Sequence, residues 1–101
     1  MEGFQNLAHS AALESKDNES VIALGSIMQD RGDFDGALLK YKVIVQNNEN
    51  SPQIWSNIGM CFYGKKKYFS AIACLKKALY LNPFDWLISY NLGLIHLAIQ
   101  Q

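Results

Sequence analysis

The stretch that decides the fold is residues 55–86, WSNIGMCFYGKKKYFSAIACLKKALYLNPFDW, which contains three consecutive lysines, two cysteines and an Asn-Pro pair. As chemistry, these residues could form a basic patch, a thiol pair or a nucleotide pocket. As structure, they could instead be the packing pattern of a repeated helical unit. The spacing of residues along the rest of the chain separates these alternatives.

Three glycines mark a fixed period. Gly25, Gly59 and Gly93 follow one another at intervals of 34 residues, and an apolar residue precedes each of them. Ala37 and Ala71 keep the same phase between the glycines. A period of about 20 to 50 residues is typical of arrays in which each unit packs only on its neighbours. The stretch is therefore interpreted first as packing and only then as chemistry.

Turn and capping residues divide each repeat into helices. Ser51 followed by Pro52 is typical of a helix start, because serine caps the helix and proline is tolerated in the first turn. Asn82 before Pro83 favours a helix end, and Gly32 favours another. The expected caps of the next helices are Asp33 and Asp85. Apolar periodicity between these signals predicts six helices, near residues 2–14, 18–31, 34–47, 52–65, 68–81 and 86–99.

The whole pattern resembles the tetratricopeptide repeat. The residues that carry the resemblance are Trp55, Ile58, Gly59, Phe62, Ala71, Leu75, Ala78 and Pro83. The resemblance implies an all-α fold in which antiparallel helix-turn-helix repeats stack as a right-handed superhelical solenoid. It divides the chain into the second helix of a partial repeat (1–17), two repeats (18–51 and 52–85) and the first helix of another partial repeat (86–101).

The composition indicates a folded chain. Half of the 101 residues are apolar and 18% are charged, which argues against disorder. No apolar run reaches the roughly 20 residues that span a bilayer, and the first residues lack the features of a signal peptide. We therefore expect a cytoplasmic protein with reduced cysteines.

The charges are distributed unevenly. Residues 1–51 hold eight acids and four bases, a balance of −4, whereas residues 52–101 hold one acid and five lysines, a balance of +4. Two interpretations are open. The charges could belong to ordinary solvated faces, or the two halves could attract each other between molecules.

We expect no enzyme activity, no cofactor and no metal site. The sequence shows neither a glycine-rich phosphate loop nor a nucleophile with a placed base. Cys61 and Cys74 fall in one repeat, but His9 and His96 fall in others, so a metal ion would lack ligands. The lysines at 65–67 fall in a turn and are interpreted as solvated, and zero net charge argues against nucleic-acid binding.

In tetratricopeptide proteins, the first helix of each repeat lines a concave groove for partners. By resemblance, this groove is formed here by Glu19, Ile22, Ser26, Gln29, Gln53, Ser56, Met60, Tyr63, Leu87, Tyr90, Leu94 and Leu97. The lining becomes more apolar along the chain, which favours an apolar peptide or a flanking piece of a larger protein. Some family members clamp a chaperone's carboxylate with lysine and asparagine, but Ile22 and Ser26 stand at those positions, so no such clamp is expected.

Some longer segments of the sequence are more specific than the general repeat pattern. Residues 32–44 (GDFDGALLKYKVI), 51–86 and 90–101 (YNLGLIHLAIQQ) resemble the family of Bardet–Biedl syndrome protein four, a subunit of the BBSome. The resemblance implies a scaffold for ciliary membrane-protein transport and cilium biogenesis. It implies other BBSome subunits and centriolar satellite or motor-adaptor proteins as partners, at the cilium, basal body and centrosome. Family members are several times longer, so this chain is expected to be an internal fragment or a short isoform.

A second interpretation is a self-assembling structural fragment. The two end helices lack half of their repeat, and a repeat unit cannot bury its apolar face alone. The side chains expected to be uncovered are Phe4, Leu7 and Leu13 at one end and Leu92, Ile95 and Ile99 at the other. We therefore expect the isolated chain to associate end to end, with the opposite charges of its halves favouring the same contact.

Overall fold

The computed structural model describes residues 18–47 and 51–101. Within these ranges the chain is helical and has no strand. Residues 18–30 are helical, and four more helices follow: α2 (Phe34–Asn47), α3 (Pro52–Gly64), α4 (Tyr68–Leu81) and α5 (Trp86–Gln100). The all-α prediction is confirmed, and these helices fall where the sequence predicted them. The expected helix at 2–14, with Phe4, Leu7 and Leu13, lies outside the described residues.

The helix starts follow from local capping. The Ser51 hydroxyl accepts a hydrogen bond of 3.4 Å from the backbone N–H of Ile54, and Pro52 occupies the first turn of α3. The Asp85 carboxylate accepts one of 3.0 Å from the N–H of Leu87 at the start of α5. These bonds satisfy backbone donors that a helix start otherwise leaves open. Both predicted caps are confirmed.

Two turns between paired helices share a left-handed residue. Gly32 has a φ of +85° between the 18–30 helix and α2, and Lys66, one repeat period later, has a φ of 63° between α3 and α4. Glycine adopts this conformation freely, whereas a lysine does so at a cost. Gly32 is therefore a helix stop, as predicted. Asp33 then accepts a hydrogen bond of 3.0 Å from the N–H of Gly36 and caps α2.

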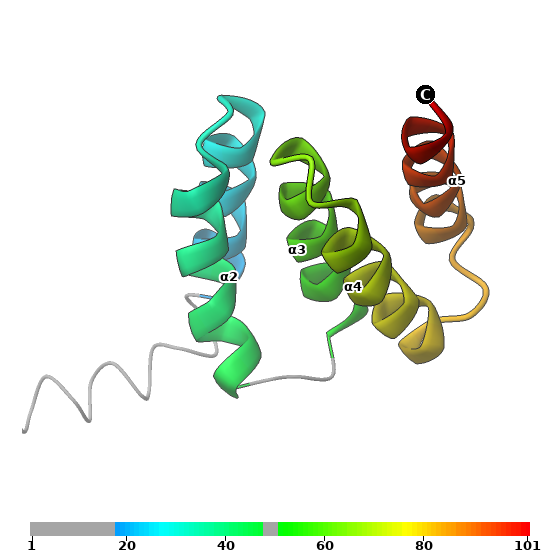
Figure 1. Cartoon of the computed structure of the whole chain (residues 1–101). Coiled ribbons are helices and arrows are strands. Elements are labelled where there is room, and N and C mark those ends of the chain that lie inside the picture. Colours follow the sequence, from blue (N-terminus) through cyan, green and yellow to red (C-terminus); the bar gives the residue numbers. More distant parts are fainter. Residues whose placement is uncertain (1–17, 48–50) are drawn as a thin grey trace, which may run out of the picture.

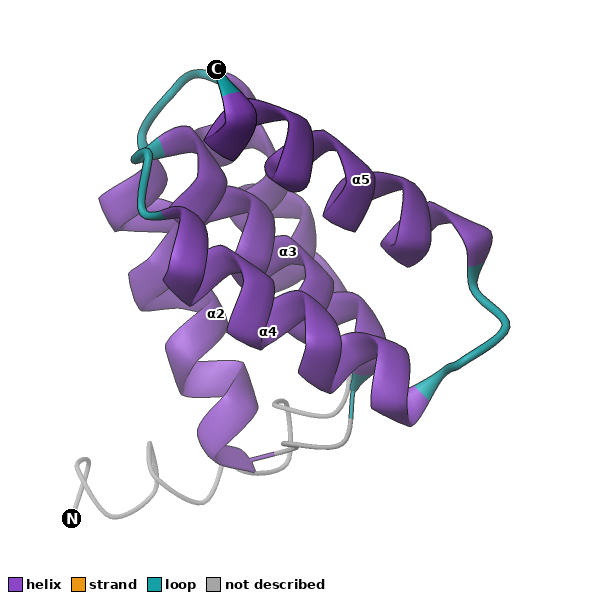
Figure 2. Cartoon of the chain, turned by 45° about the vertical axis from the view of Figure 1, so that its right-hand side comes forward, coloured by secondary structure: helices purple, strands orange, loops and turns teal. Residues whose placement is uncertain are grey.

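The helices form a single row of hairpins (Figure 1). The 18–30 helix and α2 make one antiparallel hairpin, and α3 and α4 make the next. α3 packs on α2 as well as on α4, and α4 packs on α5. Figure 2 shows α5 lying across α3 and α4 at one end of the row. This arrangement agrees with a solenoid of helical repeats.

The core consists of two clusters that meet at α3. The first joins α2 to α3 through the buried residues Ala37, Tyr41, Ile44, Ile54, Ile58 and Cys61. The second joins α4 to α5 through Ala71, Leu75, Ala78, Ile88 and Ile95. Trp55 and Phe62 of α3 are half-buried and pack against both clusters. The second hairpin therefore shares apolar contacts with both of its neighbours.

The repeated glycines explain how closely the paired helices approach. A Cβ on Gly25 would lie 2.6 Å from the ring of Tyr41, and a Cβ on Gly59 would lie 2.9 Å from Cγ of Leu75. Real Cβ atoms do not approach other heavy atoms so closely. At Gly93, the third position of the series, an added Cβ would meet no neighbouring atom within 4 Å in the described part of the chain.

One sequence-based expectation for α5 is wrong. Ile95 was expected to be an uncovered end residue, but it is fully buried in the second cluster, and Leu92 packs against that cluster too. Ile88, Leu92 and Ile95 form a stripe at helical spacing, and this stripe lies on α4 of the same chain. Of the three expected end residues, Ile99 alone is exposed.

Candidate functional site: a groove along the first helices of the repeats

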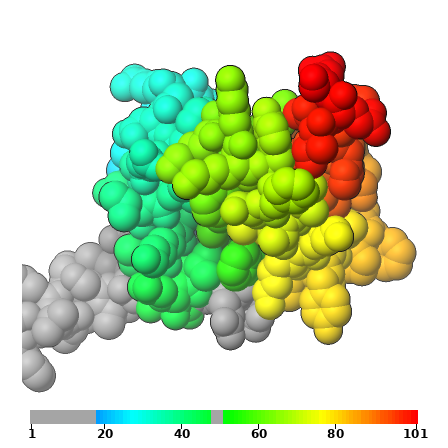
Figure 3. Space-filling model, viewed as in Figure 1, coloured from blue at the N-terminus to red at the C-terminus, as the bar shows by residue number. Residues whose placement is uncertain are grey.

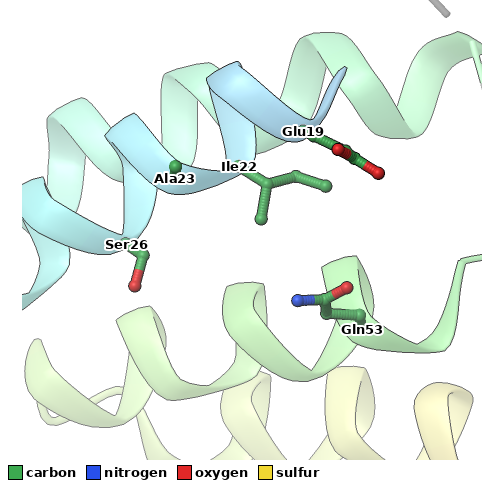
Figure 4. Close-up of a pocket in the computed structure, with 5 residues that line it drawn as sticks. All are labelled: Glu19, Ile22, Ala23, Ser26 and Gln53. Atoms are coloured by element: carbon green, nitrogen blue, oxygen red, sulfur yellow. The ribbon is translucent and has the colours of Figure 1, made fainter. Parts of the chain in front are cut away.

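A cavity lies where the sequence predicts the start of the groove. It encloses about 430 Å³ between the 18–30 helix and α3 (Figure 4). Its lining residues are Glu19, Ile22, Ala23, Ser26 and Gln53. Figure 4 shows the side chains of Ile22, Ser26 and Gln53 extending into the space between the two helices. Four of the five lining residues belong to the groove set inferred from the repeat pattern.

The cavity chemistry suits a mixed polar and apolar partner. Ile22 supplies an apolar surface to the cavity, and its position is fixed because it also packs against the first core cluster. Ser26 and Gln53 are exposed and offer a hydroxyl and an amide for hydrogen bonds. Glu19 is the single ionisable side chain in the lining. A site with one carboxylate and no cation is poorly suited to hold an anionic terminus.

Three of the predicted groove residues also make contacts within the chain. Gln29 is half-buried, and its side-chain oxygen accepts a hydrogen bond of 3.1 Å from the hydroxyl of Tyr41. Tyr63 packs against the second core cluster, with its ring centroid 6.0 Å from that of Tyr68. Met60 also packs against that cluster. These three residues therefore join the groove floor to the core.

The α5 portion of the predicted groove is apolar and largely open. Leu87, Tyr90 and Leu97 are exposed, while Leu94 is half-buried. The ring of Trp86 lies 6.4 Å from that of Tyr90 in an edge-to-face arrangement. α5 contains no lysine, arginine, aspartate or glutamate. A partner at this end of the groove would therefore bind mainly by burying apolar surface.

Reactive groups lie away from this groove. Burial raises the pKa of the Cys61 thiol to about 11 and also raises the pKa of Cys74, so both stay protonated near neutral pH. A protonated thiol is neither a good nucleophile nor a metal ligand. Across residues 18–47 and 51–101, no three His, Cys, Asp or Glu side chains are grouped so as to hold a metal ion. No described helix is long and apolar enough to cross a membrane.

The lysine turn has a structural role that the sequence interpretation missed. Lys65 forms a salt bridge with Asp35 at the start of α2, and this hydrogen bond and the lysine's charge lower the pKa of the Asp35 carboxyl. Interpreting all three lysines as solvated is therefore wrong for Lys65, which is half-buried. This pair could have been predicted from the repeat pattern, because the turns of successive repeats lie side by side in a solenoid.

Comparison with known proteins agrees with this geometry. The sequence model of the tetratricopeptide repeat family matches residues 52–85. These residues contain the α3–α4 hairpin and the glycine at which the two helices meet. Residues 52–85 form a tetratricopeptide repeat.

Longer similarity extends over nearly the whole chain. It is 53% identical over 98 residues to the BBSome complex member BBS4 of Bos taurus, covering 97% of this chain and 19% of that protein. It is 60% identical over 83 residues to BBS4 of Mus musculus, covering 82% and 16%. With the BBS4 homolog of Drosophila melanogaster it shares 40% identity over 96 residues, covering 94% and 20%. The chain thus spans about a fifth of the length of these relatives.

Proposed function

We propose that this tetratricopeptide chain is a non-catalytic scaffold segment that binds other proteins in a BBSome-type complex. The similarity to BBS4 covers 97% of the chain and supports this complex as the setting. The observation that carries the proposal is the cavity between the 18–30 helix and α3, lined by Ile22, Ser26 and Gln53. The groove inferred from the repeat pattern would extend from this cavity toward Leu87 and Tyr90 of α5, which are exposed.

The proposed ligand is a neutral segment of a partner protein with polar groups at one end and apolar side chains at the other. The polar groups would bond to Ser26 and Gln53, and the apolar ones would lie along Leu87, Tyr90 and Leu97. The remaining positions proposed to line its path are Ser56, Met60, Tyr63 and Leu94. Ile22 and Ser26 offer no positive charge, so a carboxylate clamp is not proposed.

Binding to purified BBSome subunits, measured one by one, tests the groove. Ser26→Arg with Gln53→Arg should fill the cavity and weaken the complex by about tenfold or more, equivalent to about 1.4 kcal/mol. Gln46→Arg with Asn47→Arg on α2 is the matched control, because it adds the same two side chains at exposed positions outside the groove. Equal binding by the double variant and the control would refute the groove assignment.

We further propose that the chain acts in ciliary membrane-protein transport and cilium biogenesis, at the basal body and centriolar satellites. Support comes from the BBSome named in its relatives. A fluorescently tagged chain expressed in ciliated cells should concentrate at the ciliary base, and the Ser26→Arg/Gln53→Arg variant should do so less. A uniform cytoplasmic signal from the unaltered chain would contradict this proposal.

Self-association is a second candidate, favoured by the open face of α5. Trp86, Leu87, Tyr90 and Leu97 are all exposed on a helix without a charged residue. Burying such a face on a second copy would release apolar surface from water. Light scattering over a concentration series should show dimers or larger species, and Tyr90→Glu with Leu97→Glu should restore a monomer. A monomer at every concentration would exclude this candidate.

A further inference from the structure

A second cleft lies on another face of the molecule, between α2 and α3. It encloses about 240 Å³, and its lining residues are Leu38, Lys42, Val45, Trp55, Ile58 and Phe62. At 100° per residue, Trp55, Ile58 and Phe62 occupy a different face of α3 from Gln53, Ser56 and Met60 of the groove. The cleft is therefore separate from the groove proposed above.

The walls of the cleft are apolar and held in place by the core. Ile58 is a buried core residue, and Leu38, Val45, Trp55 and Phe62 pack against the first cluster. α2 and α4 each pack on α3 but not on each other, so α3 forms the floor between them. Figures 1 and 3 view the molecule from this side, with α2 and α4 toward the viewer. The cleft is thus a preformed apolar surface.

Positive charge flanks this apolar surface. Lys42 belongs to the lining, and the Nζ atom of Lys77 on α4 lies 5.9 Å from the centroid of the Trp55 ring. α2, α3 and α4 together carry four lysines, at positions 40, 42, 76 and 77, and a single acid, Asp35. That acid is already paired with Lys65 outside these helices. The surroundings of the cleft therefore have an excess of positive charge that its own helices do not neutralise.

We propose that this cleft binds an acidic segment of a partner protein that carries large apolar side chains. Leucine or aromatic side chains of the partner enter between Val45 and Phe62 and lie against Trp55. Its carboxylates pair with Lys42 and Lys77 at the two sides. Charge complementarity selects an acidic partner, because a basic or neutral segment would leave both lysines beside apolar surface without a counterion. This binding surface is distinct from the groove of the proposed function, and the two proposals can be refuted independently.

A tryptophan-fluorescence titration with synthetic peptides tests the proposal. Trp86→Phe leaves Trp55 as the sole tryptophan of the chain, so its emission reports on the cleft. The probe is a peptide with leucine and phenylalanine at helical spacing and glutamate between them. The matched peptide has lysine in place of every glutamate. The acidic peptide should shift the emission of Trp55 and bind more weakly at 1 M salt, where the Debye length falls to about 3 Å. The lysine peptide should bind at least about tenfold more weakly.

Two double variants, each with two lysines changed to glutamate, test whether the acidic peptide binds at the cleft. Lys42→Glu with Lys77→Glu should weaken the acidic peptide by about tenfold or more. Lys66→Glu with Lys67→Glu makes the same change in net charge in the turn and should leave binding within about twofold. Circular dichroism of each variant confirms that the helices remain. The Ser26→Arg/Gln53→Arg groove variant should bind the peptide as the parent does.

Three results would overturn the proposal. The first is equal binding of the acidic and lysine peptides. The second is equal weakening by the two lysine pairs, which would indicate general attraction to positive charge. The third is binding to phosphatidylserine vesicles, tested with the same Trp55 emission, that depends on Lys42 and Lys77 while the acidic peptide does not bind. That outcome would assign the surface to a membrane instead of a protein.

Discussion

Replacing Gly59 by alanine should destabilise the fold even though alanine is the better helix former. In a helix interior the exchange would otherwise gain about 1 kcal/mol. At Gly59 the new Cβ would lie 2.9 Å from Cγ of Leu75 and 3.1 Å from the carbonyl oxygen of Ala71. One atom is a branch point of a fully buried side chain and the other is backbone, so α4 itself must shift. Overpacking costs about 1–3 kcal/mol, which gives a net loss of up to about 2 kcal/mol.

Gly93→Ala is the matched control for this prediction. It occupies the same place in the repeat, but its Cβ would meet no neighbour within 4 Å among the described residues. This variant should gain about 1 kcal/mol from helix propensity alone. Urea unfolding followed by circular dichroism at low protein concentration measures both changes. If Gly59→Ala proved as stabilising as Gly93→Ala, close helix approach could not be the reason for the repeated glycine.

Three further predictions concern a turn, a cap and two buried groups. Lys66→Gly should raise the unfolding free energy by about 1 kcal/mol, because φ is 63° there; a loss in urea unfolding would contradict this. Ser51→Ala should cost about 1 kcal/mol through the lost bond to the N–H of Ile54, and an unchanged melting temperature would show that the cap contributes nothing. Burial raises the pKa of Cys61 to about 11 from 9.0 and that of Tyr41 to about 12 from 10.0. Since the unfolded chain loses these protons first, stability should be complete below pH 9 and decline toward pH 12. Cys61→Ala should reduce the earlier part of that decline in unfolding curves recorded against pH, while the buried thiol of Cys74 keeps its own contribution. An identical pH profile would refute the assignment.

Several helix boundaries could be predicted because each of them carries a residue that acts locally. Ser51, Asp85 and Gly32 act within one turn of their own position, so no knowledge of the tertiary structure was needed. The period of 34 residues also singled out Gly25 and Gly59, and both lie where the paired helix approaches closely. Signals that act locally, or that repeat, can be interpreted from one sequence.

The exposed face of α5 could not be predicted in the same way. This helix is apolar on most sides, so its sequence pattern does not show which stripe of residues lies on α4. Ile95 was therefore predicted to be uncovered, although it is buried. The salt bridge between Lys65 and Asp35 joins two repeats, and its partners are 30 residues apart. The groove positions came from resemblance. Whether a ligand occupies them depends on a partner that the sequence does not contain.

Trp55 and Phe62 pack against both core clusters. One repeat of the sequence is therefore smaller than the unit that can fold by itself. A hairpin of α3 and α4 alone matches one sequence repeat, yet it would expose Ile54, Ile58 and Cys61, which are buried on α2. Two sequence repeats thus meet near residue 51, but the helices on either side of this position are expected to unfold cooperatively. Duplication or deletion of one repeat during evolution must preserve the contacts on both sides of α3. Single substitutions in this helix should then loosen its packing on α2 and on α4 together.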